Sequence, residues 1–205
     1  MLKIYGSKTS SNVQKVLWCC GELDLPFERD ENTGGPSRHD RTAAYMALNP
    51  NGLIPTIDED GFVLWESNVI VRYLSAKHGM GTLCPADLKK RADCERWMDW
   101  QQTAIASPMG VAFRALLRNP REATPEDQVQ AAVRKASEAW KILDTHLAAL
   151  PFVGGSTLTI GDIALGNAIH RWFKLPVERP DSPHLKAWYG RFCERPAYRQ
   201  HVAAI

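Results

Sequence analysis

The chain changes character near residue 80, and this change limits its fold more than any other feature. The first 79 residues alternate short apolar runs with helical patterns, whereas everything after residue 87 is helical in pattern. We therefore predict a mixed α/β unit followed by an all-α unit. The expected domains are residues 1–79 and 88–205, joined by a Gly- and Pro-containing linker at residues 80–87.

The first unit reads as a small sheet with helices. Val13, Val16, Leu17 and Cys20 follow the spacing of one buried helix face. This helix lies between two apolar runs, so strand, helix and strand predict a parallel βαβ unit. The expected strands are residues 2–5 and 26–32, a hairpin lies within residues 54–65, and the expected helices are residues 11–23, 43–48 and 66–78.

The second unit reads as packed helices. One helix is expected over residues 88–106, and another after Thr124 as N-cap with Pro125 as first residue. In the latter, apolar residues step alternately by four and three, as in a bundle. Thr159 and Asp162 form a capping box before a further helix.

Composition excludes several classes of function. Net charge is +2 with both signs interspersed, which gives no argument for nucleic acid or a charged membrane. No window resembles a membrane span or a secretory signal. The five cysteines show neither a CxxC pair nor a zinc spacing, so we expect buried thiols, no metal and a cytoplasmic location.

Thr9, Ser10 and Ser11 precede the first helix. Hydroxyls at this place usually cap the helix by satisfying a free N–H. A helix N-terminus also favours an anion, so a hydroxyl there could stabilise a bound thiolate. No His or carboxylate adjoins the serines, which argues against a hydrolase-type nucleophile. The local pattern alone favours capping.

A second candidate site spans the predicted hairpin. Pro55 begins a strand, where it cannot donate to the sheet, and a cis Ile54-Pro55 bond would expose Ile54 to an extended peptide. Ser67 opens the next helix and suits a carboxylate, while Glu66 suits an ammonium group. The alternative is an ordinary N-cap beside a solvated acid.

These segments together carry a resemblance. The stretches "SSNVQKVLW" and "ALNPNGLIPTIDEDGFVLWESNVIVRYLSAKHG", with the Thr159–Asp162 box, resemble a cytosolic glutathione S-transferase. The likeness covers the whole chain and is strongest over residues 42–79. The segment Ser10-Ser11-Asn12-Val13 is most similar to the serine-type theta and phi classes and their bacterial relatives.

The resemblance implies a thioredoxin-like first domain that binds glutathione and a helical-bundle second domain that binds an electrophile. Ser10 would stabilise the thiolate, with Ser11 as the other catalytic candidate, and Ser11 or Asn12 would cap the helix. Tyr5 lies too early in the strand to serve as the family's catalytic tyrosine. Cys19 and Cys20 lie too deep in the helix for a cysteine-type site.

The same resemblance distributes the rest of glutathione over the first domain. Ile54 would clamp the cysteinyl unit beside Pro55 as the cis-proline. Glu66 and Ser67 would hold the γ-glutamyl end. The loop with His39 and Arg41 would hold the glycyl end.

The implied activity is conjugation of the glutathione thiolate to small hydrophobic electrophiles, with glutathione as co-substrate and the protein as a homodimer. Two alternatives remain open at this point. One is a glutathione-dependent peroxidase, isomerase or dehalogenase on the same site. The other is a binding or scaffold protein without catalysis.

Overall fold

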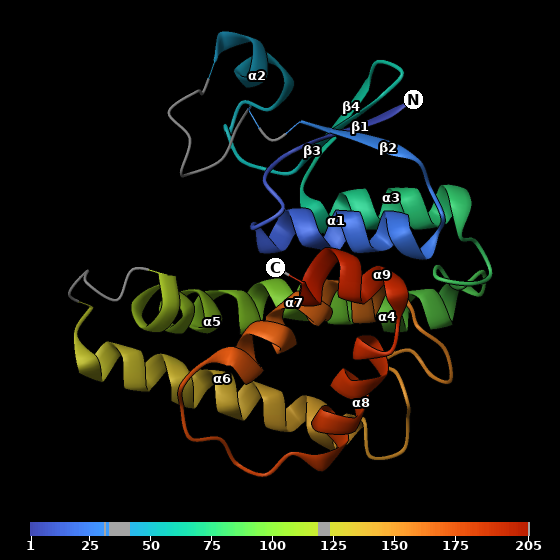
Figure 1. The fold of residues 1–205 in the computed structure, drawn as a ribbon. Helices are drawn as coiled ribbons and strands as arrows, with labels where there is room; N and C mark the ends of the chain where they lie inside the picture. Colours follow the sequence, from blue (N-terminus) through green and yellow to red (C-terminus); the bar gives the residue numbers. More distant parts are fainter. Residues whose placement is uncertain (31, 33–41, 119–123, 205) are drawn as a thin grey trace.

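We describe a computed structural model of the protein that defines residues 1–30, 32, 42–118 and 124–204 (Figure 1). A four-stranded sheet lies at one end, in the order β2-β1-β3-β4. β1 and β2 are parallel, and the other neighbouring pairs are antiparallel. The helical half lies on the other side of α1 and α3 (Figure 1).

The first half has the elements expected from its apolar runs. β1 shows the alternation of a half-buried strand, with Leu2 and Ile4 buried. β1 pairs with β2 from Leu2 opposite Phe27 to Tyr5 opposite Asp30, which confirms the parallel βαβ unit. The elements are β1 (Leu2–Tyr5), α1 (Ser11–Glu22), β2 (Phe27–Asp30), α2 (Ala43–Leu48), β3 (Thr56–Glu59), β4 (Phe62–Trp65) and α3 (Ser67–His78).

The regular elements of the second half are all helices in the described residues, and loops connect them. The helix expected over residues 88–106 continues to Arg118, interrupted by π-helical turns. Its elements are α4 (Leu88–Trp100), η1 (Gln101–Ile105), α5 (Ala106–Phe113), η2 (Arg114–Arg118), α6 (Glu126–His146), α7 (Ile160–Lys174), α8 (Pro183–Cys193), α9 (Pro196–Tyr198) and η3 (Arg199–Ala203).

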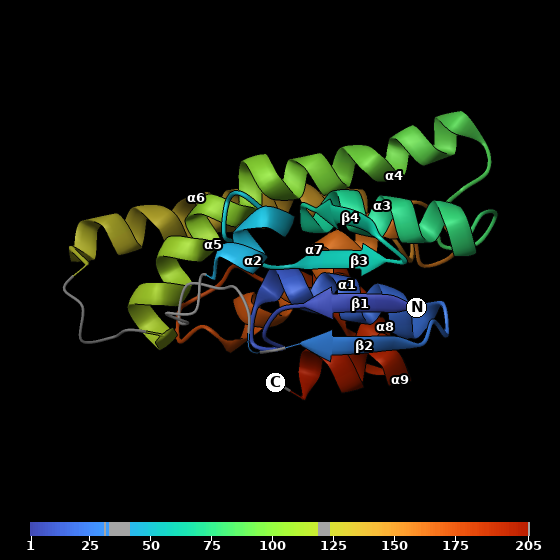
Figure 2. The same ribbon diagram turned by 90° about the horizontal axis from the view of Figure 1, so that it is seen from above.

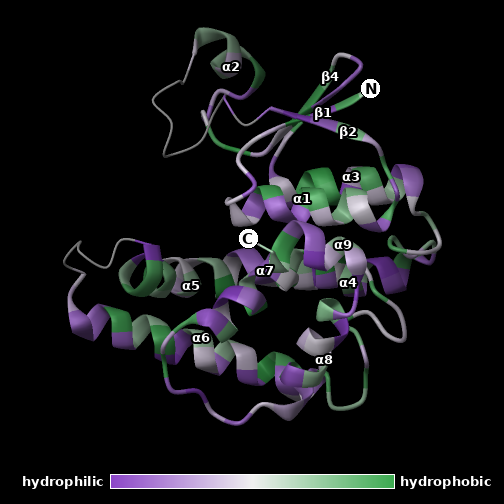
Figure 3. Cartoon of the chain, viewed as in Figure 1, coloured by the Kyte–Doolittle hydropathy of each residue, from purple (hydrophilic) through white to green (hydrophobic). Residues whose placement is uncertain are grey.

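The start of α6 differs from the prediction. Pro125, not Thr124, occupies the N-cap position, and Glu126 is the first helical residue. Pro125 has an extended backbone, with φ of −54° and ψ of 134°. Proline is tolerated at a helix start because an N–H there would have no partner within the helix. The expected amphipathic pattern is present, and hydrophobic and hydrophilic residues alternate along α6 in Figure 3.

α1 and α3 lie between the sheet and the helical half (Figures 1 and 2). α1 therefore needs apolar residues on more than one face. All eight residues from Val13 to Cys20 are buried, including Gln14 and Lys15. The one-face spacing seen in the sequence marks the side toward the sheet and underestimates how deeply this helix is buried.

Trp18 joins the two halves. Its ring is fully buried and lies edge-on against Tyr198 and Phe192 of the C-terminal helices, at centroid distances of 4.7 and 5.1 Å. A Cβ at Gly166 of α7 would come within 2.2 Å of the Trp18 ring. Glycine is thus required where α7 passes this indole. The Tyr198 hydroxyl donates to the Gly166 carbonyl at 2.8 Å.

The capping box at the start of α7 is confirmed. The Asp162 carboxylate is fully buried and accepts from the backbone N–H and the hydroxyl of Thr159, each at 2.9 Å. It also accepts from the Val153 N–H at 3.0 Å and from Trp188 Nε1 at 2.8 Å. Burial raises the pKa of Asp162, and these donors oppose the rise. Asp162 therefore links α7 to the loop at Val153 and to α8, besides capping α7.

We predict that Asp162→Ala destabilises the protein by about 3 kcal/mol or more, because several buried donors lose their acceptor. Thr159→Ala should cost about 1 kcal/mol, the usual effect of losing an N-cap. Urea unfolding of both variants measures these losses. Equal losses in the two variants would show that Asp162 acts as a cap alone. Glutathione affinity, where the folded variants retain it, should stay at the wild-type value.

Candidate active site

The N-terminus of α1 is the centre of the candidate site. Its first residues follow β1 directly, through a turn in which the Ser10 N–H donates to the Ser7 carbonyl at 3.0 Å. The first intrahelical bond joins the Gln14 N–H to the Ser10 carbonyl at 2.9 Å. The N–H groups before Gln14 lie at the positive end of the helix dipole, where they favour an anion.

The three hydroxyls have different positions. Ser10 is the N-cap residue of α1, and its hydroxyl makes no capping hydrogen bond. The prediction that Ser11 or Asn12 caps the helix is wrong, because both lie inside it. The Thr9 hydroxyl pairs with that of Ser7 at 3.0 Å. Among the described residues, the Ser10 hydroxyl therefore keeps its hydrogen-bonding capacity for a ligand.

A cavity brings the residues of the second candidate site together. Residues from three segments line it, and they include the four predicted residues Ile54, Pro55, Glu66 and Ser67. The lining residues are Asn12 of α1, Asn49, Asn51, Leu53, Ile54 and Pro55 before β3, and Trp65, Glu66 and Ser67 after β4. The Ile54-Pro55 peptide bond is cis, as predicted. The sequence did not indicate the three asparagines.

Hydrogen bonds hold the loop before Pro55 in place. The Tyr45 hydroxyl donates to the Leu53 carbonyl at 2.5 Å, and Asn49 Nδ2 donates to the same oxygen at 2.9 Å. Both side chains also bond the Thr56 hydroxyl, at 2.9 and 3.1 Å. The backbone on each side of Ile54 is thereby fixed before any ligand binds.

Glu66 has a strained backbone. Its φ is 73° and its ψ is 108°, which L-residues with a side chain rarely adopt. Such residues concentrate at functional sites, where the surrounding structure holds them. Here the strain turns the chain from β4 directly into α3 and places Glu66 and the buried Ser67 on the cavity wall.

A larger cleft lies between the two halves, on the other side of Asn12. Its described lining comprises Ser11, Asn12 and Lys15 of α1, Gln101 and Gln102 of η1, Ala106, Met109 and Gly110 of α5, and Asn167, Ala168 and Arg171 of α7. Asn12 lines both this cleft and the smaller cavity, whereas Ser10 belongs to the described lining of neither.

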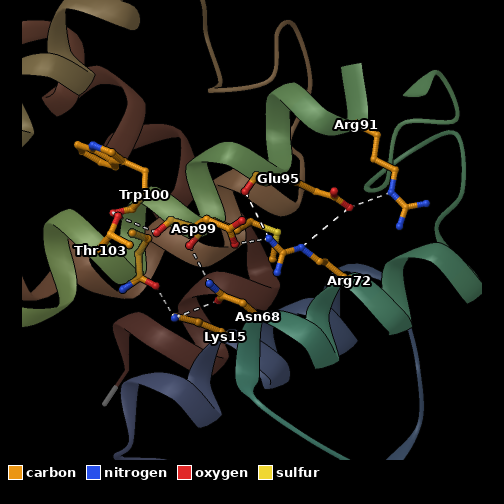
Figure 4. A network of polar contacts seen from close by, with 10 residues as sticks. Lys15, Asn68, Arg72, Arg91, Glu95, Asp99, Trp100 and Thr103 are labelled. Atoms are coloured by element: carbon orange, nitrogen blue, oxygen red, sulfur yellow. Dashed lines mark hydrogen bonds and ion pairs between the residues drawn. The ribbon is translucent and has the colours of Figure 1, made fainter. Parts of the chain in front are cut away.

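Lys15 is a buried cation at this cleft. Its side chain leaves α1 toward α3, and its ammonium donates to Asn68 Oδ1 at 3.2 Å and to Gln101 Oε1 at 2.7 Å (Figure 4). Burial lowers its pKa from 10.5 to about 7, although the charge of Glu66 opposes the shift. The sequence did not indicate this site, because lysine is common on helix surfaces.

Ion pairs tie α3 to α4 beside Lys15 (Figure 4). Arg72 pairs with Asp99 and lies 3.9 Å from Glu95, which also accepts from Arg91 at 2.9 Å. Asn68 Nδ2 donates to the Met98 carbonyl at 2.8 Å. Asn68 therefore holds Lys15 with its oxygen and α4 with its nitrogen, which fixes one wall of the cleft.

The cysteines are free, and four of them are buried. Burial raises the pKa of Cys19 to about 12, so this thiol is not a thiolate at neutral pH. Among the described residues, no cluster of His, Cys, Asp and Glu could hold a metal ion. No helix in the described part is long and apolar enough to cross a membrane. The predicted site residues His39 and Arg41 lie outside the described residues.

Comparison with known proteins assigns the family. The models of the glutathione S-transferase N-terminal and C-terminal domains match residues 9–77 and 126–191. The chain is 34% identical over 204 residues to glutathione S-transferase GstB of Escherichia coli, covering 98% of each. This protein belongs to the glutathione S-transferase family. It is also 33% identical over 223 residues to glutathione S-transferase 3 of Zea mays, covering 100% of this chain and 94% of the other.

Solved structures agree with this transferase fold. A theta-class glutathione S-transferase of Xanthomonas axonopodis pv. citri with glutathione bound matches with a TM-score of 0.92 and 41% identity. The match covers 98% of this chain and 96% of that one. The thioredoxin-like first domain and the helical second domain expected from the sequence are therefore confirmed.

We predict that Lys15 makes stability depend on pH. The Lys15 amine has a pKa of 10.5 in the unfolded chain and about 7 in the folded chain. The free-energy cost of burying the charged amine is therefore largest below pH 7 and decreases as pH rises. Between these values the free energy of unfolding should rise by up to about 1.4 kcal/mol per pH unit relative to Lys15→Met.

Urea unfolding of wild type and Lys15→Met at several values between pH 7 and 9.5 measures this difference. Groups common to both proteins cancel when the two curves are subtracted. Curves that run parallel would show that Lys15 keeps its ordinary pKa in the fold.

Proposed function

We propose that this transferase conjugates the thiol of glutathione to a small electrophile, with Ser10 stabilising the thiolate. The main support is the Ser10 hydroxyl, which lies at the N-terminus of α1 without a capping partner. The N–H donors and the helix dipole at this place stabilise an anion in the same position.

The two cavities suit the two substrates. The smaller cavity, with Ile54, Glu66 and Ser67, fits an extended peptide with a γ-glutamyl end. The larger cleft would hold the electrophile. Because Asn12 lines both cavities, a thiol at the N-terminus of α1 would lie near the cleft, and this arrangement would contribute proximity. Glutathione bound in the Xanthomonas relative supports glutathione as the co-substrate.

The reaction needs little covalent work from the protein. The thiol loses its proton to water, and the sulfur electron pair forms a bond to the electrophilic carbon. On a haloaromatic substrate the carbon–halogen bond breaks and halide leaves. The protein contributes a lower thiol pKa and a fixed orientation.

We predict that Ser10→Ala raises the thiol pKa of bound glutathione by about one to two units, because a charge-assisted hydrogen bond is worth about 1.5–3 kcal/mol. Turnover at neutral pH should fall, with a modest loss of binding. Ultraviolet thiolate absorbance of the complex against pH measures the shift.

Ser11→Ala and Thr9→Ala are the matched controls for this measurement. Ser11 is inside the helix and the Thr9 hydroxyl bonds Ser7, so neither change should move the titration. Both variants should unfold within about 0.5 kcal/mol of wild type. An unchanged titration in Ser10→Ala, with a shift in either control, would contradict the assignment of Ser10.

Turnover also separates a transferase from a scaffold. The proposed enzyme should be retained on a glutathione-affinity resin and should conjugate 1-chloro-2,4-dinitrobenzene. Retention without turnover of this substrate or of an organic hydroperoxide would indicate a binding protein.

We further propose a cytoplasmic homodimer. Phe62, Trp65 and Val69 are large apolar side chains at β4 and the start of α3 that are 49, 38 and 41% exposed. Aromatic residues are enriched at protein interfaces. Sedimentation at micromolar concentration should give a dimer, and Phe62→Glu should weaken it. A single wild-type species near 23 kDa would contradict this proposal.

A further inference from the structure

The charge of the cleft is one-sided. Two of its lining side chains are basic, Lys15 and Arg171, and no Asp or Glu belongs to the described lining. With a pKa of about 7, Lys15 is only partly protonated at neutral pH, and an anion beside it would favour its protonated form. Most of the other lining side chains are polar amides, a hydroxyl or small apolar groups. A pocket for neutral hydrophobic electrophiles has no need of two cations, since desolvating a charge costs free energy.

Arg171 lies beside the residue proposed to stabilise the thiolate. One of its guanidinium nitrogens donates to the Thr9 carbonyl at 3.0 Å, immediately before Ser10. Its guanidinium carbon lies 4.1 Å from the centre of the Phe113 ring, which holds the group flat. Burial and the neighbouring Arg118 lower the pKa of Arg171 to about 10, so the group stays charged at neutral pH.

No described carboxylate forms an ion pair with Lys15 or Arg171, although the charge of Glu66 acts on Lys15. The Arg171 fork has further N–H groups beyond the one bonded to Thr9, and a planar carboxylate can accept two of them. The Lys15 ammonium has three protons, and two of them are used by amide oxygens.

Asn167 is a buried polar side chain beside Arg171 in this cleft. It lies between Gln14 and the cleft, is 3% exposed, and lines the cleft with Arg171. Its Nδ2 donates to Gln14, but its Oδ1 has no partner among the described atoms. This oxygen is a hydrogen-bond acceptor, so a donor such as a water molecule in the cleft would satisfy it, whereas a carboxylate would not.

We propose that the cleft selects electrophiles that carry a carboxylate or a similar small anionic group, held by Arg171 with Lys15 contributing the second positive charge. This inference builds on the proposed function and specifies its substrate class. The anionic group would sit against α7, and the reacting carbon would face the thiolate at Ser10. The hydrophobic electrophile implied by the resemblance would then be the poorer substrate.

A matched pair of substrates tests this inference. 4-Chloro-3,5-dinitrobenzoate and 4-chloro-3,5-dinitrobenzamide have nearly the same shape and differ in charge. In each, the thiolate sulfur bonds to the ring carbon and chloride leaves with the electron pair of the broken carbon–chlorine bond. Dividing kcat/KM by the uncatalysed rate with glutathione removes the difference in ring reactivity.

For wild type we expect the corrected kcat/KM to favour the benzoate by about tenfold or more, the effect of one charge-assisted contact. Arg171→Gln should abolish this preference, and Lys15→Met should reduce it. Arg171→Lys should retain part of it. Lys174→Gln is the control, because Lys174 lies on the same helix, is exposed and lines a neighbouring cavity instead.

Binding gives a second readout that needs no turnover. Calorimetry with S-methylglutathione present should show 3,5-dinitrobenzoate binding about tenfold or more tightly than 3,5-dinitrobenzamide, and Arg171→Gln should remove the difference. Circular dichroism and urea unfolding confirm that each variant is folded. Lys15→Arg serves as a charge-retaining variant if Lys15→Met does not fold.

Different outcomes overturn the two proposals. If wild type turns over both substrates with equal corrected kcat/KM, the proposed preference for anionic electrophiles is wrong and the proposed transferase function stands. If Arg171→Gln loses glutathione affinity and keeps the substrate preference, Arg171 binds glutathione and not the electrophile. That result would also overturn the proposed preference for anionic electrophiles. If neither substrate reacts, the transferase proposal fails, and calorimetry alone decides whether the cleft binds the carboxylate.

Discussion

The packing of Trp18 against Gly166 is the contact on which the rest of the molecule depends. The indole comes from the first domain and the glycine from the second, and a side chain at Gly166 would occupy the space of the ring. This contact brings α1 and α7 side by side. The cleft exists only because of that approach, since α1 supplies Lys15 and α7 supplies Arg171. The interface between the domains therefore determines both stability and the chemistry of the site.

Among the described residues, the buried charged side chains include Asp162 and Lys15, and their hydrogen-bond partners differ. Asp162 receives four hydrogen bonds, which satisfy its oxygens and join α7 to neighbouring segments. Lys15 donates hydrogen bonds to two neutral amide oxygens and lines the cleft. A saturated carboxylate is suited to folding, whereas an under-compensated cation beside a cavity is suited to binding. The difference lies in the partners and not in the depth of burial.

The candidate site was predictable where its residues lie close together in the chain. Ile54, Pro55, Glu66 and Ser67 belong to a hairpin with fixed intervals, and the structure places all four on one cavity. The capping box was predictable for the same reason, because Thr159 and Asp162 are one helical turn apart. The N-cap of α1 was misplaced by one residue, since any of three consecutive hydroxyls fits the same local rule. Only the backbone angles of Ser10 distinguish them.

The sequence by itself determined the order of elements, the sheet-forming and helical halves, and the hairpin that carries the peptide cavity. Each of these depends on spacing along the chain, which apolar periodicity and turn residues record directly. The tertiary structure alone decided that Lys15 is buried, that Arg171 bonds the carbonyl of the residue before Ser10, and that Asn12 lines both cavities. Arg171 is 162 positions from Thr9, and no local pattern encodes a contact over that separation because it depends on how the two domains pack.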